Sequence, residues 1–336
     1  MRFLLDEEQR AFGATLDRML GTAGTPSAVR AWAAGDHGPG RALWTRLAAA
    51  GVFALAVPEQ HEGVGPLPVE LTVAFTELGR HAVPGPVVET VAAAALLDRL
   101  DDKAAAAEWL PRVASGEALL SLVLDQPATH YALDPDAADA VLVVDGDQLR
   151  LSTVWGPVQP SIDPARRLAR PLGGELLAEG PAVREAARHA AEVAALLTAA
   201  QALGAGRYLL AETVAYAKKR TQFGVAIGSF QVVKHRLADT LIGLEFAQPL
   251  LHAAALALAA GDPSAEREIA AAKVSACETA YAAARTALQL HGAVGYTDEL
   301  DLSLWIRKAR ALRSAWGTPA ACRAQVLAPG ADPVSR

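Results

Sequence analysis

The stretch KKRTQFGVAIGSFQVVKHRLAD, residues 218–239, contains three cations near its start, a Phe-Gly break and two glutamines in one short span. It begins and ends on helix-like sequence but is interrupted by two glycines, and Arg220 and Phe223 stand at the stop before Phe230 begins the next helix. A plain corner between two helices explains this pattern as well as a ligand site does, because cations at the end of a helix complement its negative dipole end. The stretch therefore predicts two long helices joined at a break and leaves the purpose of the break open.

A second helix break occurs in LQLHGAVGYTDE, residues 288–299. We expect a long helix to end at Gln289 and to run into a glycine-spaced loop in which His291 is solvated. Glycines in such a loop let backbone N–H groups approach an anion closely. One break offers a guanidinium and the other offers amides, so the two together favour a phosphate-bearing ligand more than either does alone.

The helical segments around these breaks are long, and they are predicted at residues 181–219, 230–260, 264–291 and 300–315. Long helices with short connections pack as an antiparallel bundle. The first part of the chain is also helical, whereas the middle consists of short β-prone runs with a hairpin expected around Gly146. The fold class is therefore mainly α with a small β insert. The expected domains are an N-terminal helical domain at 1–117, a reduced β domain at 118–179 and a C-terminal four-helix bundle at 180–336.

Composition restricts the function further. The 336 residues are 52% hydrophobic and carry a formal net charge of −6 without a dominant basic stripe, so nucleic-acid binding is not expected. Cys277 and Cys322 have neither metal-ligand nor disulfide-framework spacing, which favours packing roles in a reducing compartment and no metal site. The acidic N-terminus does not resemble a signal peptide, and the nearly uncharged stretches 193–206 and 247–261 fall short of the roughly 20 residues that span a bilayer. These features predict a soluble cytoplasmic protein that is not inserted in a membrane.

The two stretches that contain the breaks, RTQFGVAIGSFQVVKHRLAD and QLHGAVGYTDELDLSLWIRKAR, together resemble the C-terminal domain of the acyl-CoA dehydrogenase family. The stretches LAVPEQHEGVG and ELGRHAVPGPVVET look like the N-terminal helical domain of that family. The resemblance spans nearly the whole chain and is weakest in the middle. It implies an acyl-CoA dehydrogenase fold with a helical N-terminal domain, a reduced β-barrel and a four-helix bundle, with FAD and acyl-CoA as ligands.

In that family the FAD lies across a subunit interface, with its ring on the β domain of one chain and its diphosphate and adenine on the neighbour. The resemblance assigns a half-site to this chain, consisting of Arg220, Gln222 and Phe223 at the diphosphate, Phe230 and Gln231 at the adenine end, and Gln289, Gly292 and Ala293 along the diphosphate. Ala293 replaces a glycine of the family, and its methyl group is expected to push the backbone slightly away from the phosphates.

The catalytic base of the family is missing from its usual place. Family members remove the α-proton of the acyl-CoA with a glutamate, usually in a Tyr-Glu-Gly-Thr-like segment, and such a base must lie within reach of that carbon. The matching stretch here is SAWGTPAA, in which Trp316 occupies the place of the glutamate. A minority of members place the base on the helix before the first break, near Ala194. The nearest carboxylate is Glu192, about 200° away around that helix, so we assign no catalytic residue.

The middle of the chain is also depleted. The Thr-Glu-Pro…Gly-Ser-Asp loop with which the family grips the flavin ring corresponds to DQPATHYALDPDAAD, residues 125–139, where Asp125-Gln126-Pro127 is at best a remnant. The chain thus keeps the residues that would bind the diphosphate and adenine of a neighbour's FAD. It lacks the loop and the glutamate that it would need for a flavin of its own. This asymmetry resembles the short subunits of heteromeric acyl-CoA dehydrogenases from actinobacterial steroid catabolism.

That resemblance implies an α2β2 heterotetramer in which a longer acyl-CoA dehydrogenase subunit supplies the glutamate, the ring pocket and the thioester contacts. The substrate is then an acyl-CoA, with a steroid side-chain CoA ester among the candidates, and an electron-transfer acceptor reoxidises the flavin. Two alternatives remain open: a self-sufficient flavoenzyme that uses another base such as Glu192 or Glu245, and a non-catalytic structural or regulatory binding protein of the same fold.

Overall fold

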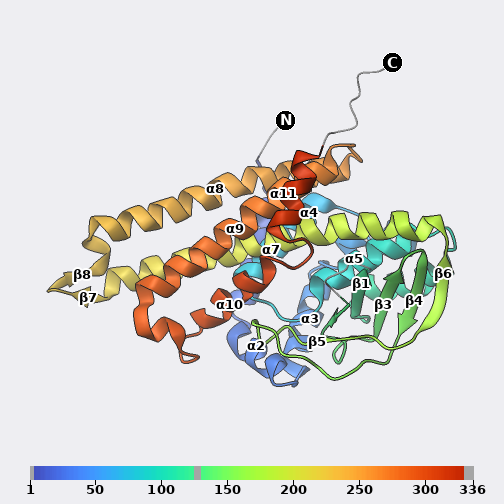
Figure 1. The fold of residues 1–336 in the computed structure, drawn as a ribbon, viewed down its shortest axis with the longest axis horizontal. Helices are drawn as coiled ribbons and strands as arrows, with labels where there is room; N and C mark the ends of the chain where they lie inside the picture. Colours follow the sequence, from blue (N-terminus) through green and yellow to red (C-terminus); the bar gives the residue numbers. More distant parts are fainter. Residues whose placement is uncertain (1–3, 125–129, 329–336) are drawn as a thin grey trace, which may run out of the picture.

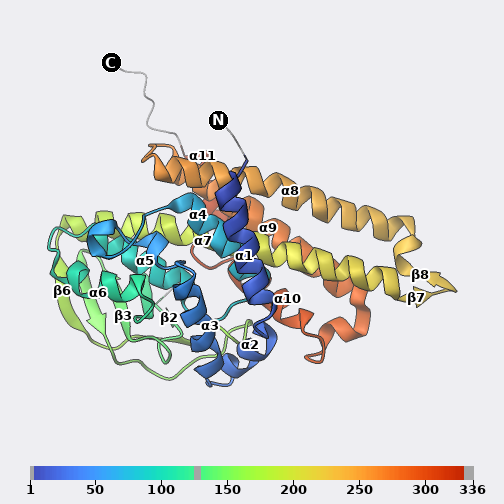
Figure 2. The ribbon, with the colours of Figure 1, turned by 180° about the vertical axis from the view of Figure 1, so that it is seen from behind.

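The computed structural model describes residues 4–124 and 130–328 of the chain. Figure 1 shows an elongated molecule in which long helices run along the longest axis and the larger β-sheet lies at one end. Figure 2 shows the opposite face, where helix α1 crosses the bundle. The sheet and the far end of the bundle are therefore separated by most of the length of the molecule.

The N-terminal part is helical. Its elements are α1 Glu7–Gly21, α2 Thr25–Ala33, α3 Gly38–Ala49, the 3-10 turns η1 Ala54–Ala56 and η2 Glu59–His61, α4 Pro68–Arg80, α5 Val87–Asp98 and α6 Ala104–Ala114. Asp6 and Gln9 form a capping box that fixes the start of α1, because each side chain accepts a hydrogen bond from the other residue's backbone N–H. Helix α5 is the central element: ten of its twelve residues are buried, so it has no polar face.

The middle of the chain forms a small β region. Its strands are β1 Leu120–Leu124, β2 Ala132–Leu133, β3 Ala140–Asp145, β4 Gln148–Ser152, β5 Leu168–Ala169 and β6 Glu175–Glu179. One sheet has the order β1-β3-β4-β6, in which β1 and β3 are parallel and the other pairs antiparallel, and β2 pairs with β5 separately. The hairpin expected at Gly146 is confirmed, because Asp145 pairs with Gln148 and Gly146 has a φ of 61°.

The C-terminal part contains the long helices of the molecule. Its elements are α7 Pro181–Lys219, β7 Thr221–Gln222, β8 Val225–Ala226, η3 Ile227–Ser229, α8 Gln231–Ala259, α9 Ala265–His291, η4 Gly292–Tyr296, α10 Leu302–Leu312 and α11 Pro319–Leu327. The expected helices are present within a few residues, although α10 is shorter than predicted and α11 was not predicted. The free thiols of Cys277 and Cys322 are both buried in this part.

Helices α4 and α7 cross closely because a glycine of each helix lies at the contact. A Cβ at Gly79 would lie 2.0 Å from the Gln201 carbonyl oxygen, and a Cβ at Gly204 would lie 1.8 Å from that of Thr76. Real side chains do not tolerate such contacts. The two glycines therefore fix how the N-terminal helices dock on the bundle.

Two helices, α7 and α8, are long and apolar enough to span a membrane by length and composition, so the expectation that no stretch reaches that length was wrong. They differ in burial: 78% of the apolar window of α7 is buried, against 33% for α8. The exposed side of α8 carries apolar side chains, which we call the α8 apolar face: Val232, Leu241, Ile242, Phe246 and Leu250. Exposed apolar patches of this kind mark interaction surfaces.

Candidate functional site

The first helix break is an ordered hairpin. Strands β7 and β8 pair antiparallel across the two-residue turn Phe223-Gly224, and both turn residues have positive φ, 52° and 79°. Such a turn matches the twist of the two strands. The Ile227 N–H donates to the Arg220 carbonyl oxygen at 2.8 Å and closes the hairpin. Phe223 is 92% exposed at the tip, in a conformation that is costly for a non-glycine residue.

The second break lies at the same end of the bundle. The ring of Tyr216, near the end of α7, stacks on the ring of His291, the last residue of α9, with centroids 4.1 Å apart. The Nδ1 atom of His291 lies 2.8 Å from the Ala287 carbonyl oxygen. His291 is buried, so the expectation of a solvated side chain was wrong. Helix α9 ends at His291, as the predicted segment 264–291 has it, and two residues beyond the end expected from the second break. The stack joins the ends of α7 and α9.

All eight predicted half-site residues are exposed in the isolated chain: Arg220, Gln222, Phe223, Phe230, Gln231, Gln289, Gly292 and Ala293. The rings of Phe223 and Phe230 meet edge to face, with centroids 6.4 Å apart. Gly292 has a φ of 63°, which favours glycine. A guanidinium, two aromatic rings and exposed backbone amides at one end of a bundle can together clasp a diphosphate and a flat base.

This half-site lies far from the chain's own β region. In Figure 1 the β7–β8 hairpin projects from one end of the long axis, and the sheet of β1, β3, β4 and β6 occupies the other end. The half-site and that sheet therefore lie at opposite ends of the molecule.

Trp316, which occupies the sequence position of the expected base, is held by a hydrogen bond to a buried carboxylate. The indole Nε1 of Trp316 donates to Oε1 of Glu89 at 2.9 Å, and Glu89 is 3% exposed. The cavity that remains beside them measures about 10 Å³, with Thr198 and Gln201 of α7 among its lining residues. A space of this size holds about one water molecule. An acyl group does not fit beside Trp316 in this conformation.

Glu89 was missed by the sequence analysis, although the signal was present. It is the one charged residue in the run VVETVAAAALL, and a lone carboxylate in an apolar helix needs a partner. The partner, Trp316, lies 227 positions away in the sequence. That distance explains why spacing alone did not reveal the pair.

The two carboxylates considered as alternative bases lie elsewhere. Glu192 pairs with Arg188 at 3.2 Å and lies 3.7 Å from His189, and it is not among the residues that line the cavity at Trp316. Glu245 is exposed on α8, 3.7 Å from Arg207. The loop remnant Asp125-Gln126-Pro127 falls outside the described residues.

Asp134 is a second buried carboxyl in the β region. It adopts a φ of 49°, and its Oδ1 accepts a hydrogen bond from the Arg167 N–H at 2.8 Å. Its Oδ2 has no hydrogen-bond partner among the described residues. Burial raises the pKa of Asp134 to about 8, against the lowering effects of the Arg167 N–H bond and the nearby Arg166 charge.

We expect Asp134→Asn to stabilise the chain at alkaline pH. The pKa of Asp134 in the folded chain lies above its value in the unfolded chain. The contribution of the protonated carboxyl to stability is therefore fully present below about pH 4 and is lost as the pH rises towards 8. The loss amounts to roughly 1 kcal/mol per pH unit. Asparagine stays neutral, tolerates positive φ and keeps the oxygen that accepts from Arg167. Urea unfolding at pH 5, 7 and 8.5 measures the gap between variant and wild type. A gap that does not widen with pH contradicts this account.

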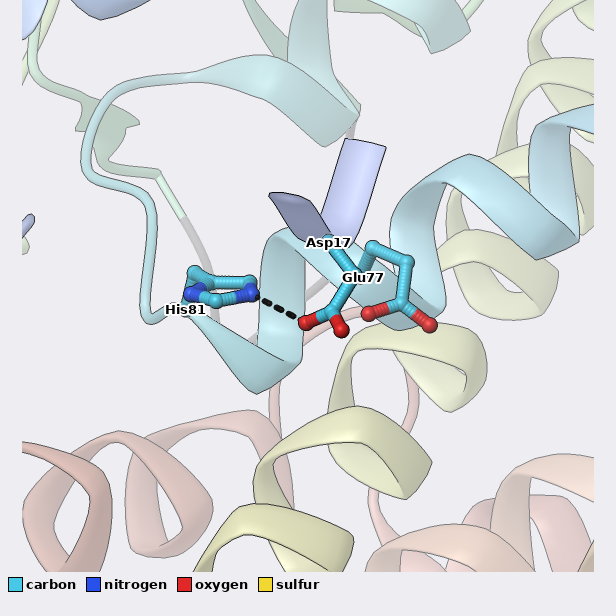
Figure 3. Close-up of side chains that lie close together, drawn as sticks. All are labelled: Asp17, Glu77 and His81. Atoms are coloured by element: carbon cyan, nitrogen blue, oxygen red, sulfur yellow. Dashed lines mark hydrogen bonds and ion pairs between the residues drawn. The ribbon is translucent and has the colours of Figure 1, made fainter. Parts of the chain in front are cut away.

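Three potential metal ligands gather between α1 and α4. One ligand atom from each of Asp17, Glu77 and His81 lies within 4.8 Å of the others, and Figure 3 shows His81 joined to Asp17 with Glu77 alongside. Arg80 already supplies a cation, 3.6 Å from Asp17 and 4.0 Å from Glu77. Burial raises the pKa of Glu77 to about 7, which weakens it as a ligand at neutral pH. The cluster therefore serves as an ion-pair network that joins the two helices.

Comparisons with known proteins agree over most of the chain. Residues 6–117 match the family model described as acyl-CoA dehydrogenase, N-terminal domain, and residues 177–328 match the model for the C-terminal domain. The acyl-CoA dehydrogenase IpdE2 of Mycobacterium tuberculosis is 36% identical over 309 residues, which cover 90% of this chain and 91% of that protein.

Solved structures show the same fold. A chain of the ChsE4–ChsE5 complex from Mycobacterium tuberculosis superposes with a TM-score of 0.83 at 23% identity, over 98% of this chain and 100% of that one. A chain of the Tcur3481–Tcur3483 steroid ACAD superposes with a TM-score of 0.81 at 24% identity, over 95% and 96% of the two chains.

Proposed function

Because this chain belongs to the acyl-CoA dehydrogenase family, the FAD-dependent oxidoreductases that act on acyl-CoA thioesters, we propose that it is the cofactor-completing subunit of a heteromeric member. It contributes the half-site for the diphosphate and adenine of an FAD whose ring lies on a longer acyl-CoA dehydrogenase subunit. That partner supplies the catalytic base.

The observation that carries this proposal is the separation of the half-site from the chain's own β region. All eight half-site residues are exposed at the hairpin end, whereas the position of the base, at Trp316, is filled. The residues present suit one part of a bound FAD: a guanidinium for the diphosphate and aromatic rings for a flat base. When bound, FAD accepts the hydride from the acyl-CoA.

The α8 apolar face supports a partner of the same fold. It leaves five large apolar side chains in solvent along a helix that continues directly from the half-site. Two of the solved structures with this fold contain pairs of differently named chains, ChsE4–ChsE5 and Tcur3481–Tcur3483. We propose an α2β2 heterotetramer on this basis, and a steroid side-chain CoA ester as substrate because one of those pairs is a steroid ACAD.

Co-expression with a longer acyl-CoA dehydrogenase homologue from the same genome tests the proposal. We expect the chain alone to purify with little flavin, and the complex to hold about one FAD per heterodimer, as measured by flavin absorbance after denaturation. A homo-oligomer of this chain with full FAD occupancy contradicts it.

The buried Glu89 favours a second candidate function, that of a self-sufficient enzyme. It is a carboxylate of this chain that is hydrogen-bonded to Trp316, the residue in the place of the missing base, and both side chains line the same small cavity. That function predicts bleaching of flavin bound to the purified single chain when acyl-CoA of varied chain length is added. Absence of bleaching with every chain length rules it out.

A further inference from the structure

A larger cavity lies between α4, α5, α7 and the end of α8. Its volume is about 230 Å³, and its buried walls are apolar, with Leu71, Val91, Leu196 and Leu197 among them. Water in such a space finds few hydrogen-bond partners. Displacing it with an apolar group is therefore favourable.

This cavity is separate from the closed space at Trp316. The two share no lining residue, although both use α5 and α7. It also lies apart from the eight exposed residues at the hairpin, since none of them lines it. A flavin or its half-site therefore does not account for it.

Small residues keep the cavity open. Ala95 of α5 and Ala56 stand in its wall, and Ala259 and Gly261 stand where α8 ends. A larger side chain at any of these positions would project into the space. The size excludes large ligands, because typical small-molecule pockets measure roughly 300–1,000 Å³.

The rim of the cavity carries balanced charge. Arg99 offers a cation and Asp98 an anion, and neither makes an ion pair with another part of the described chain. His189 is the third polar residue, and Glu192 beside it is already paired with Arg188. A charged head group would meet one attractive and one repulsive partner here. A neutral group that both donates and accepts hydrogen bonds fits better.

We propose that this cavity binds a small, neutral, largely apolar molecule that carries one hydroxyl or carbonyl group. Its apolar body lies against Val91, Leu196 and Leu197, and its polar group lies at Asp98 and Arg99. The site is independent of the cofactor half-site, so the chain carries two ligand sites rather than one.

The test is calorimetric titration of trans-decahydro-1-naphthol, a compact bicyclic alcohol, into the chain in the assembly in which it purifies. We expect saturable binding that Ala95→Phe weakens at least about tenfold, because the ring of the new side chain fills the cavity. Ala259→Trp, at the exposed rim, narrows the entrance and is expected to weaken binding without a change in the core. The matched control, Ala320→Phe, makes the same change on an exposed turn of α11 and should bind normally.

Three results overturn the proposal: no saturable binding, equal binding by wild type and both cavity variants, or tighter binding of decanoate than of the alcohol. Assembly and FAD content are measured on the same samples. If these are normal while the alcohol fails to bind, the cavity proposal alone falls. If the alcohol binds while FAD is absent from the complex, the proposed function falls and the cavity proposal stands.

Discussion

The Arg220→Ala variant is expected to assemble with its longer partner and to leave the complex with little FAD. Arg220 is exposed at the base of the hairpin, directly after the end of α7. A charge-assisted hydrogen bond to a phosphate is worth about 1.5–3 kcal/mol, so its loss should weaken FAD binding roughly 10- to 100-fold. Titration of FAD into the deflavinated complex, followed by flavin fluorescence, measures the change.

Two controls sharpen this experiment. Arg267→Ala removes an arginine that is also exposed, at the opposite end of α9, and should leave FAD affinity unchanged. Arg220→Lys keeps the charge but cannot donate two parallel hydrogen bonds. Its FAD affinity should therefore lie between that of Arg220→Ala and that of Arg267→Ala. If Arg220→Ala binds FAD as tightly as Arg267→Ala does, the hairpin is not a cofactor site.

The Phe246→Asp variant is expected to abolish assembly. Phe246 is 71% exposed in the second half of the α8 apolar face, the region that we expect the partner to bury. A carboxylate there would be desolvated without a counter-ion, and central aromatic residues commonly contribute about 2–4 kcal/mol to binding. We therefore expect association to be weaker by at least roughly 30-fold, seen by light scattering as separated subunits.

The control for this variant is Ile162→Asp, which places the same charge on a side chain that is 57% exposed in the β region. It should assemble normally. Intact heteromers of Phe246→Asp at micromolar concentration would show that the partner binds elsewhere. In that case the α8 apolar face needs another explanation.

Local features of the sequence predicted the elements well. Gly261 follows the end of α8 and Gly292 follows the end of α9, as expected of glycines that stop helices, and the Gly146 hairpin follows from its turn residues. Helix α9 ends at His291, which agrees with the predicted segment 264–291 and lies two residues beyond the end expected from the second break; the stack between His291 and Tyr216 supports this end. That contact is tertiary and leaves no trace in local spacing.

The candidate site was predictable only in part. The residues at the two breaks could be read from the sequence, and so could the tryptophan in place of the base. The pair of Glu89 and Trp316 could not, because it joins helix α5 to a loop near the end of the chain. The exposed side of α8 was hidden for a different reason: periodicity shows that a helix has an apolar face, but not whether its own chain covers that face.

The strained tip of the hairpin has a consequence for how this subunit tolerates change. Phe223 is almost entirely exposed and holds a backbone conformation that glycine adopts more easily, so Phe223→Gly should make the free subunit slightly more robust. The same substitution removes a ring from the surface offered to the cofactor. A screen for thermal stability of the isolated subunit would thus select a variant that has lost part of the cofactor half-site. Only a screen on the assembled enzyme would retain Phe223.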